Sequence, residues 1–246
     1  MLNQSTKSEI RMKSLLNVFQ ILLIWIWTAF ICLVGLVLVI GFSQQFTIYW
    51  TSQFWSGFIF GISGVKLKVV GVENIPLNES VIYVSNHSSS FDIPALFWGI
   101  PVPLFYLAKM ELKNIPFFGW FIQAVGMVFV DRANHVNAMS SLMKAGNEIK
   151  KGKNIITFPE GGRTRDGEIK QFRRGSFILA LENNIDIIPI AISGARAVNP
   201  PGYRITPGTI TITIGKPFNT REYDSKEPDF YAKEVENWVR NTVAKI

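Results

Sequence analysis

The order of apolar and polar positions divides this chain into two parts that meet near residue 65. No aspartate, glutamate, lysine or arginine lies between Lys13 and Lys66, whereas charged residues recur throughout the remainder. Within the uncharged part, Val18 to Phe42 is almost wholly apolar, with Gln20 and Thr28 as polar interruptions. A helix of this length is long enough to cross the hydrocarbon core of a bilayer. The first part therefore predicts a membrane segment.

A cleavable signal peptide is the alternative interpretation of this segment, because Lys7, Arg11 and Lys13 precede it. However, the apolar run is longer than the core of a usual signal peptide, and Gly41 to Gln44 lacks the small-residue pattern of a cleavage site. We therefore expect the segment to be retained.

A second uncharged stretch, from Phe46 to Gly64, carries aromatic residues at helical spacing. Phe46, Trp50, Phe54 and Phe58 recur every four positions and would form one stripe along a helix. The stripe has two interpretations. Trp and Tyr favour the headgroup boundary of a membrane, but a helix that faces the core of a globular domain shows the same spacing.

Charge on both flanks of the uncharged part indicates how it is arranged. Basic residues precede it and a basic body follows it after Lys66, and positive flanks favour the cytoplasmic side of a membrane. A hairpin of two helices with its turn near Gly41 to Gln45 puts both flanks on that side. Such a hairpin either spans the bilayer or enters one leaflet. We expect residues 1–64 to anchor the chain to the cytoplasmic membrane, with residues 65–246 as a domain on the cytoplasmic side.

From Lys66 onward, short apolar runs alternate with segments of helical pattern. Apolar runs of this length are typical of strands buried on both faces of a sheet. Their alternation with helices predicts an α/β fold with a mixed, largely parallel central sheet flanked by helices. The expected strands are Lys66–Val72, Val81–Ser85, Leu104–Ala108, Met127–Asp131, Ile155–Phe158, Ile187–Ile192 and Ile210–Gly215. The expected helices are Pro94–Phe97, Phe117–Gln123, Val136–Lys150, Ser176–Asn183 and Asp229–Lys245.

Charge and composition narrow the possible partners. The formal net charge of +7 favours anionic partners such as lipid headgroups or phosphorylated substrates. The uncharged first part favours an anionic membrane surface over nucleic acid, and the sequence has no zinc-finger or RNA-binding signature. The lone cysteine, Cys32, excludes an intrachain disulfide, and one cysteine with two histidines argues against a closed structural zinc site.

One of the two histidines, His87, stands directly after an expected strand, and Asp92 follows five positions later. On one continuous helix these two side chains would point about 140° apart. A strand, a serine-rich turn and a helix that begins near Asp92 would instead bring them together. Asp92 would then orient the imidazole and stabilise its protonated form, which makes His87 a candidate general base.

The serines around His87 raise the alternative of a serine hydrolase. The Gly-x-Ser-x-Gly elbow of many such enzymes is absent from the sequence. We expect Ser88, Ser89 and Ser90 to build the turn and to cap the helix that begins at Asp92.

A group of residues suited to an anion follows another expected strand. It contains Glu160, Gly161 and Arg163. Glycine lets backbone N–H groups approach an anion closely, and the planar fork of arginine suits phosphate. The alternative is a turn closed by a surface ion pair between Glu160 and Arg163. Further cations at expected strand or loop ends, each either a solvated charge or part of a funnel for a phosphorylated substrate, are Lys109, Arg132 and Arg173.

Taken together and in order, these blocks resemble the glycerolipid acyltransferase family, most closely its bacterial 1-acylglycerol-3-phosphate acyltransferases. The resemblance extends over about Lys66 to Gly215. The family's Asn-His-x4-Asp block is matched by Asn86, His87 and Asp92, and its Gly-x-x-Phe-Ile-Asp-Arg block by Gly126, Phe129, Asp131 and Arg132. Its Phe-Pro-Glu-Gly-Thr-Arg-Ser block is matched by Phe158, Pro159, Glu160, Gly161 and Arg163, with Gly162 and Thr164 in place of the usual Thr and Ser.

The resemblance implies direct acyl transfer from acyl-CoA or acyl carrier protein to the sn-2 hydroxyl of lysophosphatidic acid, which forms phosphatidic acid without a metal or other cofactor. It implies that His87, oriented by Asp92, takes the hydroxyl proton. It also implies a binding site for the glycerol-phosphate end, made by Glu160, Gly161 and Arg163 with help from Arg132, Lys109 and Arg173. Two alternatives stand beside it: the same chemistry on another lysolipid, and a non-catalytic lipid-binding protein of the same fold, against which the intact His87 and Asp92 argue.

Overall fold

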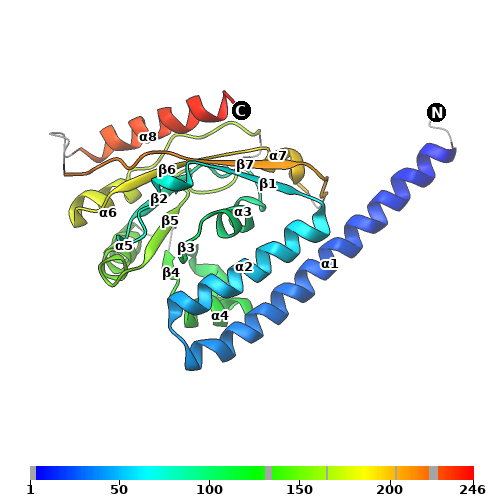
Figure 1. Ribbon diagram of the computed structural model, residues 1–246, viewed down its shortest axis with the longest axis horizontal. Helices are drawn as coiled ribbons and strands as arrows, with labels where there is room; N and C mark the ends of the chain where they lie inside the picture. The colour runs from blue at the N-terminus through cyan, green and yellow to red at the C-terminus, as the bar shows by residue number, and fades with distance from the viewer. Residues whose placement is uncertain (1–3, 131–134, 165, 203, 222–226) are drawn as a thin grey trace.

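The computed structural model describes residues 4–130, 135–164, 166–202, 204–221 and 227–246, and its centre is one seven-stranded sheet (Figure 1). The strands lie in the order β1-β7-β6-β2-β5-β3-β4. All neighbouring pairs are parallel except β6 with β7. The sheet is therefore mixed and largely parallel, as the sequence predicted. The strands are β1 (Lys66–Val70), β2 (Ile82–Ser85), β3 (Leu104–Lys109), β4 (Val128–Val130), β5 (Asn154–Thr157), β6 (Ile187–Ser193) and β7 (Thr209–Ile214).

Each of the seven expected strands is present, with ends shifted by a few residues. The prediction worked because the central strands are covered on both faces. Every residue of β2 and β5 is buried, and so are the first six residues of β6. Helices α5, α6 and α8 pack against one face of the sheet, whereas α2 and α3 pack against the other (Figure 1). Continuous burial produces the uninterrupted apolar runs seen in the sequence.

The five expected helices are also present, again with small shifts at their ends. They are α3 (Asp92–Gly99), α4 (Phe118–Ala124), α5 (His135–Lys150), α6 (Gly175–Asn183) and α8 (Pro228–Val243). Three short helical segments were not predicted: η1 (Val72–Asn74), η2 (Met110–Asn114) and α7 (Ala195–Val198). Segments of three to five residues are too short to show a helical repeat in the sequence.

The expected helical hairpin is present and is made of α1 (Gln4–Gly41), which begins in the charged residues before Ser14, and α2 (Gln44–Ser63). Ser43 is the N-cap of α2, and its side chain accepts a hydrogen bond from the Phe46 backbone N–H at 3.2 Å. In Figure 1, α1 runs diagonally along the body and its amino end projects beyond it, while α2 lies between α1 and α3.

The aromatic stripe of α2 does not face the core. Phe46, Trp50 and Phe54 are exposed, whereas the small polar residues of the same helix are buried against the body. Those buried residues are Thr47, Thr51, Ser52, Ser56 and Ser63. The alternative interpretation of the stripe as a core face is therefore wrong. The small side chains let α2 lie close to its neighbours.

Helix α1 contains a segment, Ser14–Gly41, that is long and apolar enough to cross a membrane. The two polar side chains that interrupt its apolar run form hydrogen bonds with α2. Gln20 Nε2 donates to the Ile62 carbonyl at 2.9 Å, and Thr28 Oγ1 accepts from the Trp55 indole N–H at 2.9 Å. The outer face of α1 is left apolar and exposed, through Phe19, Leu22, Trp25, Ile26, Phe30, Leu33, Val37 and Ile40.

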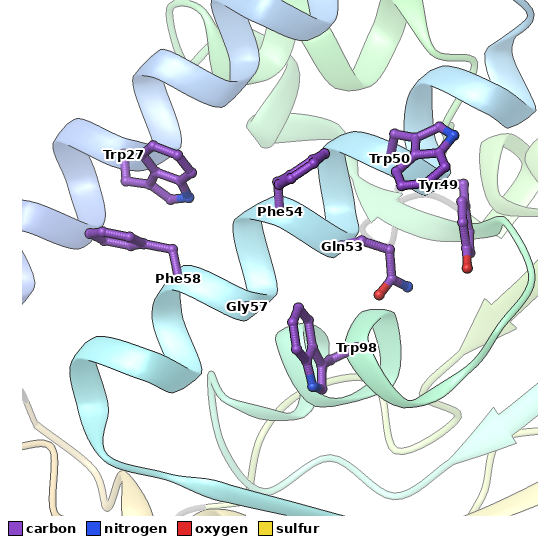
Figure 2. A pocket seen from close by; sticks show the side chains of 8 residues that line it. All are labelled: Trp27, Tyr49, Trp50, Gln53, Phe54, Gly57, Phe58 and Trp98. Atoms are coloured by element: carbon purple, nitrogen blue, oxygen red, sulfur yellow. The ribbon is translucent and has the colours of Figure 1, made fainter.

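The hairpin also docks on α3. Gln53 Nε2 donates to the Phe97 carbonyl at 2.6 Å, and a Cβ atom at Gly57 would lie 2.2 Å from the Trp98 ring. Together α1, α2 and α3 form an aromatic groove of about 500 Å³, shown in Figure 2. None of the site residues predicted from the sequence lines this groove, whose lining is Trp27, Tyr49, Trp50, Gln53, Phe54, Gly57, Phe58 and Trp98.

Candidate active site

His87 and Asp92 meet in the turn between β2 and α3. The strand ends at Ser85 and the helix begins at Asp92, so the intervening residues reverse the chain. His87 Nδ1 lies 2.8 Å from Asp92 Oδ2. The expected juxtaposition of the two side chains is thus present, in the form of a strand, a turn and a helix start.

The carboxylate of Asp92 is fixed by the backbone of the same turn. Its Oδ2 atom accepts hydrogen bonds from the Ser88 N–H at 2.7 Å and the Ser89 N–H at 2.8 Å, in addition to its contact with His87. Asp92 is 0% exposed. A buried carboxylate held in this way fixes the tautomer with the proton on Nδ1, which leaves Nε2 of His87 as a proton acceptor.

The serines of the turn have structural partners. Ser89 Oγ donates to the Asn199 carbonyl at 3.1 Å and accepts from the Phe91 N–H at 3.2 Å, so Ser89 does build the turn. The predicted capping is wrong, because Phe91 occupies the N-cap of α3 and no side chain caps that helix. The Asp92 N–H at the start of the helix donates instead to the Ser89 carbonyl at 3.3 Å, and Pro94 in the first turn has no N–H to satisfy.

Two further contacts hold the histidine turn in place. The Asn86 side chain donates to the Ile192 carbonyl at 2.9 Å and accepts from the Ile192 N–H at 2.8 Å, which ties the turn to β6. The His87 ring stacks on the Phe158 ring, with centroids 4.0 Å apart and planes 13° apart. Neither contact was foreseen, because both partners are distant in sequence and no local pattern links them to His87.

Glu160 is placed differently from the expectation for a substrate-binding residue. It is 5% exposed, its Oε1 atom accepts from the His87 N–H at 2.6 Å, and its Oε2 atom accepts from the Lys170 N–H at 3.0 Å. Burial raises the pKa of this carboxyl group, although the two backbone hydrogen bonds act in the opposite direction. Both oxygens are therefore engaged with the protein backbone.

The alternative interpretation of this loop, a surface ion pair between Glu160 and Arg163, is not seen among the ion pairs of the described residues. Arg163 instead donates from Nη1 to Ser90 Oγ and is exposed at the edge of the histidine turn. Its guanidinium thus stands close to the turn that carries His87, in a position to meet an anion.

The other expected cations are spread more widely. Arg173 lies against Gly161, where a Cβ atom would be 2.9 Å from the guanidinium carbon, and Gly161 has a φ of 79°. Glycine is thus required at this position by both its conformation and this close approach. Lys109, at the end of β3, is exposed and pairs with Glu111 at 2.9 Å. Arg132, together with Asp131, lies outside the described residues.

A cleft of about 770 Å³ opens beside the histidine turn. Part of the lining is polar and includes Arg163 and Thr164, and part is apolar and comes from α1, whereas His87 and Asp92 are not among the lining residues. Its lining is Ile21, Ile24, Trp25, Ser88, Ser89, Ser90, Phe91, Arg163, Thr164, Asn199, Pro200, Pro201, Gly202 and Ile205. The contribution of α1 and of residues 199–202 and 205 was missed, because an apolar helix in the sequence does not reveal which of its residues face a cleft.

This arrangement suits proton abstraction from a hydroxyl group that carries both an anion and an apolar chain. The imidazole is the proton acceptor, the cation at the cleft edge fits the anion, and the apolar wall fits the chain. Within the part of the chain that the structure describes, no three His, Cys, Asp or Glu side chains are grouped as metal ligands would be.

Comparison with known proteins identifies the family. The sequence model of the family described as acyltransferase matches residues 66–193. The 1-acyl-sn-glycerol-3-phosphate acyltransferase of Pseudomonas aeruginosa is 33% identical over 186 residues, which cover 75% of this chain and 72% of that protein. The protein of the same name from Saccharomyces cerevisiae is 32% identical over 187 residues, which cover 74% of this chain and 61% of that protein.

A solved structure shares the fold over nearly the whole chain. The crystal structure of the 1-acyl-sn-glycerophosphate (LPA) acyltransferase from Thermotoga maritima matches with a TM-score of 0.82 and 26% sequence identity, covering 96% of both chains. The family match spans the histidine turn, the loop that follows β5 and the proline-containing strand β6. The chain therefore belongs to the acyltransferase family.

Proposed function

We propose that this protein transfers a fatty acyl group from a thioester donor, acyl-CoA or acyl carrier protein, to the sn-2 hydroxyl of 1-acylglycerol-3-phosphate, which yields phosphatidic acid. The observation that carries the proposal is the His87–Asp92 pair in a turn whose serines line a cleft with both a cationic and an apolar lining. The names of the two relatives and of the solved structure supply the choice of acceptor.

The proposed reaction is a direct transfer with His87 as general base. Nε2 of His87 takes the proton from the sn-2 hydroxyl while the hydroxyl oxygen attacks the thioester carbonyl. The new C–O ester bond forms, the C–S bond breaks, and the thiolate leaves and takes the proton back from the imidazolium. Asp92, held by two backbone N–H groups, keeps the imidazole oriented and stabilises its charge during the transfer.

For the acceptor, we assign the phosphate to Arg163 and the backbone near Gly161, with Arg173 and Lys109 as further cations. Arg132 is included in this assignment on the family motif alone. The acyl chain of the acceptor lies against Ile21, Ile24 and Trp25 in this assignment, because these residues form the apolar wall of the same cleft. Glu160 contributes through the backbone of His87, since both of its oxygens bind backbone N–H groups.

We also propose that the hairpin attaches the protein to the anionic cytoplasmic face of the inner membrane. The apolar segment Ser14–Gly41 and the outward-facing aromatic residues of α2 support attachment. The basic residues Lys7, Arg11 and Lys13 and the net charge of +7 favour the anionic side. Attachment would bring a lysolipid from the membrane to a cleft whose apolar wall is α1.

A donor-by-acceptor activity matrix tests the proposal. The purified full-length protein is assayed with acyl-CoA and acyl carrier protein donors against lysophosphatidic acid and other lysolipids, with His87→Ala as the inactive reference. We expect turnover with lysophosphatidic acid that is lost in His87→Ala, while the variant still binds vesicles. Turnover with a different lysolipid alone would refute the acceptor, and no turnover with any pair would refute the enzymatic function.

A further inference from the structure

The His87 imidazole is held by contacts on two of its sides. Along its edge, Nδ1 lies 2.8 Å from Asp92 Oδ2. On its face, the Phe158 ring is stacked at 4.0 Å with an angle of 13° between the planes. The edge contact restrains Nδ1 but permits the ring to tilt about that hydrogen bond. The stacked ring removes the tilt, so the direction of Nε2 depends on both contacts.

Phe158 is itself fixed well enough to act as a support. It follows β5 directly and is half-buried, and its ring lies 5.9 Å from the Tyr106 ring of β3. Tyr106 is anchored in turn, because its hydroxyl donates to the Ile93 carbonyl of α3 at 3.3 Å. The support for the imidazole thus comes from the sheet, whereas Asp92 belongs to α3.

We propose that Phe158 is a positioning residue that fixes the His87 ring and favours its protonated form. The inference rests on the proposed role of His87 as general base. The face of an aromatic ring carries negative electrostatic potential, so it attracts an imidazolium more strongly than a neutral imidazole. The stacked ring therefore favours the state that His87 reaches when it has taken the hydroxyl proton.

The other groups around the imidazole do not replace this contribution. The Asp92 carboxylate contacts the edge of the ring, and the Glu160 carboxyl group accepts from the His87 backbone N–H. Arg163 binds Ser90. Burial, with the charge of Asp92 nearby, raises the pKa of Tyr106 well above its ordinary value, so this phenol stays neutral. Among these groups, Phe158 alone contacts the face of the ring, which makes its effect separable by substitution.

A titration of His87 tests the proposal without any substrate. The sequence has only two histidines, so the full-length protein with His135→Gln in detergent micelles gives a single imidazole signal by NMR. In this background we expect Phe158→Leu to shift the midpoint of the imidazole signal to lower pH, because the attraction of the aromatic face for the imidazolium is lost. Because a general base must be neutral, the acid limb of kcat/KM should move in the same direction, and kcat should fall while the acceptor KM stays within about twofold.

Matched variants separate stacking from packing. Phe158→Tyr keeps the aromatic face and should restore both the pKa and kcat. Phe158→Met fills a similar volume without an aromatic face, so it should change the pKa and kcat in the same direction as Phe158→Leu. It replaces the leucine variant if that variant does not fold. Phe97→Leu removes a buried ring that contacts Tyr106 but not His87, and it should lower thermal stability without moving the pKa.

An unchanged His87 pKa in both Phe158→Leu and Phe158→Met would overturn the proposal, and so would a failure of Phe158→Tyr to restore it. These outcomes differ from a failure of the proposed function. If the proposed function fails, no donor and acceptor pair gives turnover, but the titration still reports whether the Phe158 ring favours the protonated imidazole.

Discussion

The backbone N–H of His87 donates to Glu160 Oε1 at 2.6 Å, so the histidine turn and the loop after β5 form one unit. A second bond runs in the opposite direction, from the Thr164 N–H to the His87 carbonyl at 3.3 Å. Both backbone groups of His87 are thus paired with residues 160–164. Two motifs that lie more than seventy positions apart in the chain are therefore one structural element. A substitution in either motif should alter the position of the imidazole.

Glu160→Gln should lower kcat strongly without preventing folding. The glutamine side chain has one acceptor oxygen and one amide donor, so it can accept from only one of the two N–H groups that Glu160 now binds. The other N–H would face a donor, which costs about 1–3 kcal/mol of stability. Thermal unfolding and steady-state kinetics measure the two effects. Glu168→Gln, at an exposed position of the same loop, is the control and should be neutral.

The free energy of unfolding should also depend on pH through the ionisation of Glu160. Because burial raises its pKa, the folded state holds the proton more tightly than the unfolded state. Its contribution to stability is therefore complete below the ordinary glutamate pKa and is lost as the pH rises through the raised value. The free energy of unfolding of the wild type, relative to Glu160→Gln, should fall with rising pH across this interval. A difference that is flat or that rises with pH, measured by denaturant unfolding, contradicts this assignment.

The hydrogen bonds of Glu160 are not encoded in its local sequence. A glutamate followed by two glycines and an arginine has the same pattern whether its carboxylate meets a ligand or a backbone N–H. The strands were predictable because burial on both faces leaves a local mark, and His87 and Asp92 were predictable because they are five residues apart. The stacking of Phe158 and the apolar wall from α1 depend on contacts between distant segments, which no local pattern encodes.

Asp92→Asn should reduce kcat by roughly 10²–10⁴-fold while the acceptor KM changes little. The amide can keep bonds to the turn, but it lacks the negative charge that stabilises an imidazolium at 2.8 Å. Because His87 and Asp92 act as one unit, the double variant with His87→Ala should be no slower than His87→Ala alone. Additive losses in this cycle would show that Asp92 acts independently of His87. Circular dichroism checks that the variants are folded.

Arg163→Ala should raise the KM for lysophosphatidic acid by roughly 10–100-fold, since a charge-assisted contact with phosphate contributes about 1.5–3 kcal/mol. Arg163→Lys keeps the charge without the planar fork and should give an intermediate KM. Arg174→Ala removes an exposed arginine that does not line the cleft, and it is the matched control. Equal KM values for Arg163→Ala and Arg174→Ala would remove Arg163 from the acceptor site.

Two glycines of the hairpin provide a test of how α1 is held against the body. A Cβ atom at Gly35 of α1 would lie 2.2 Å from a ring carbon of Phe121, which is itself buried in α4. A Cβ atom at Gly61 of α2 would meet nothing within 4 Å. Alanine favours a helix over glycine by about 0.5–1 kcal/mol, so Gly61→Ala should raise the melting temperature slightly.

At Gly35 the same gain is outweighed, because forcing extra volume into a packed interface costs about 1–3 kcal/mol. Gly35→Ala should therefore lower the melting temperature in detergent. It should also lower activity, because Ile21, Ile24 and Trp25 of the displaced helix form the apolar wall of the cleft. If both alanine variants shift the melting temperature in the same direction, the contact between Gly35 and Phe121 does not hold α1 in place, and the apolar wall must be positioned by its other contacts, such as the 2.8 Å bond from the Ile205 N–H to Asn17 Oδ1.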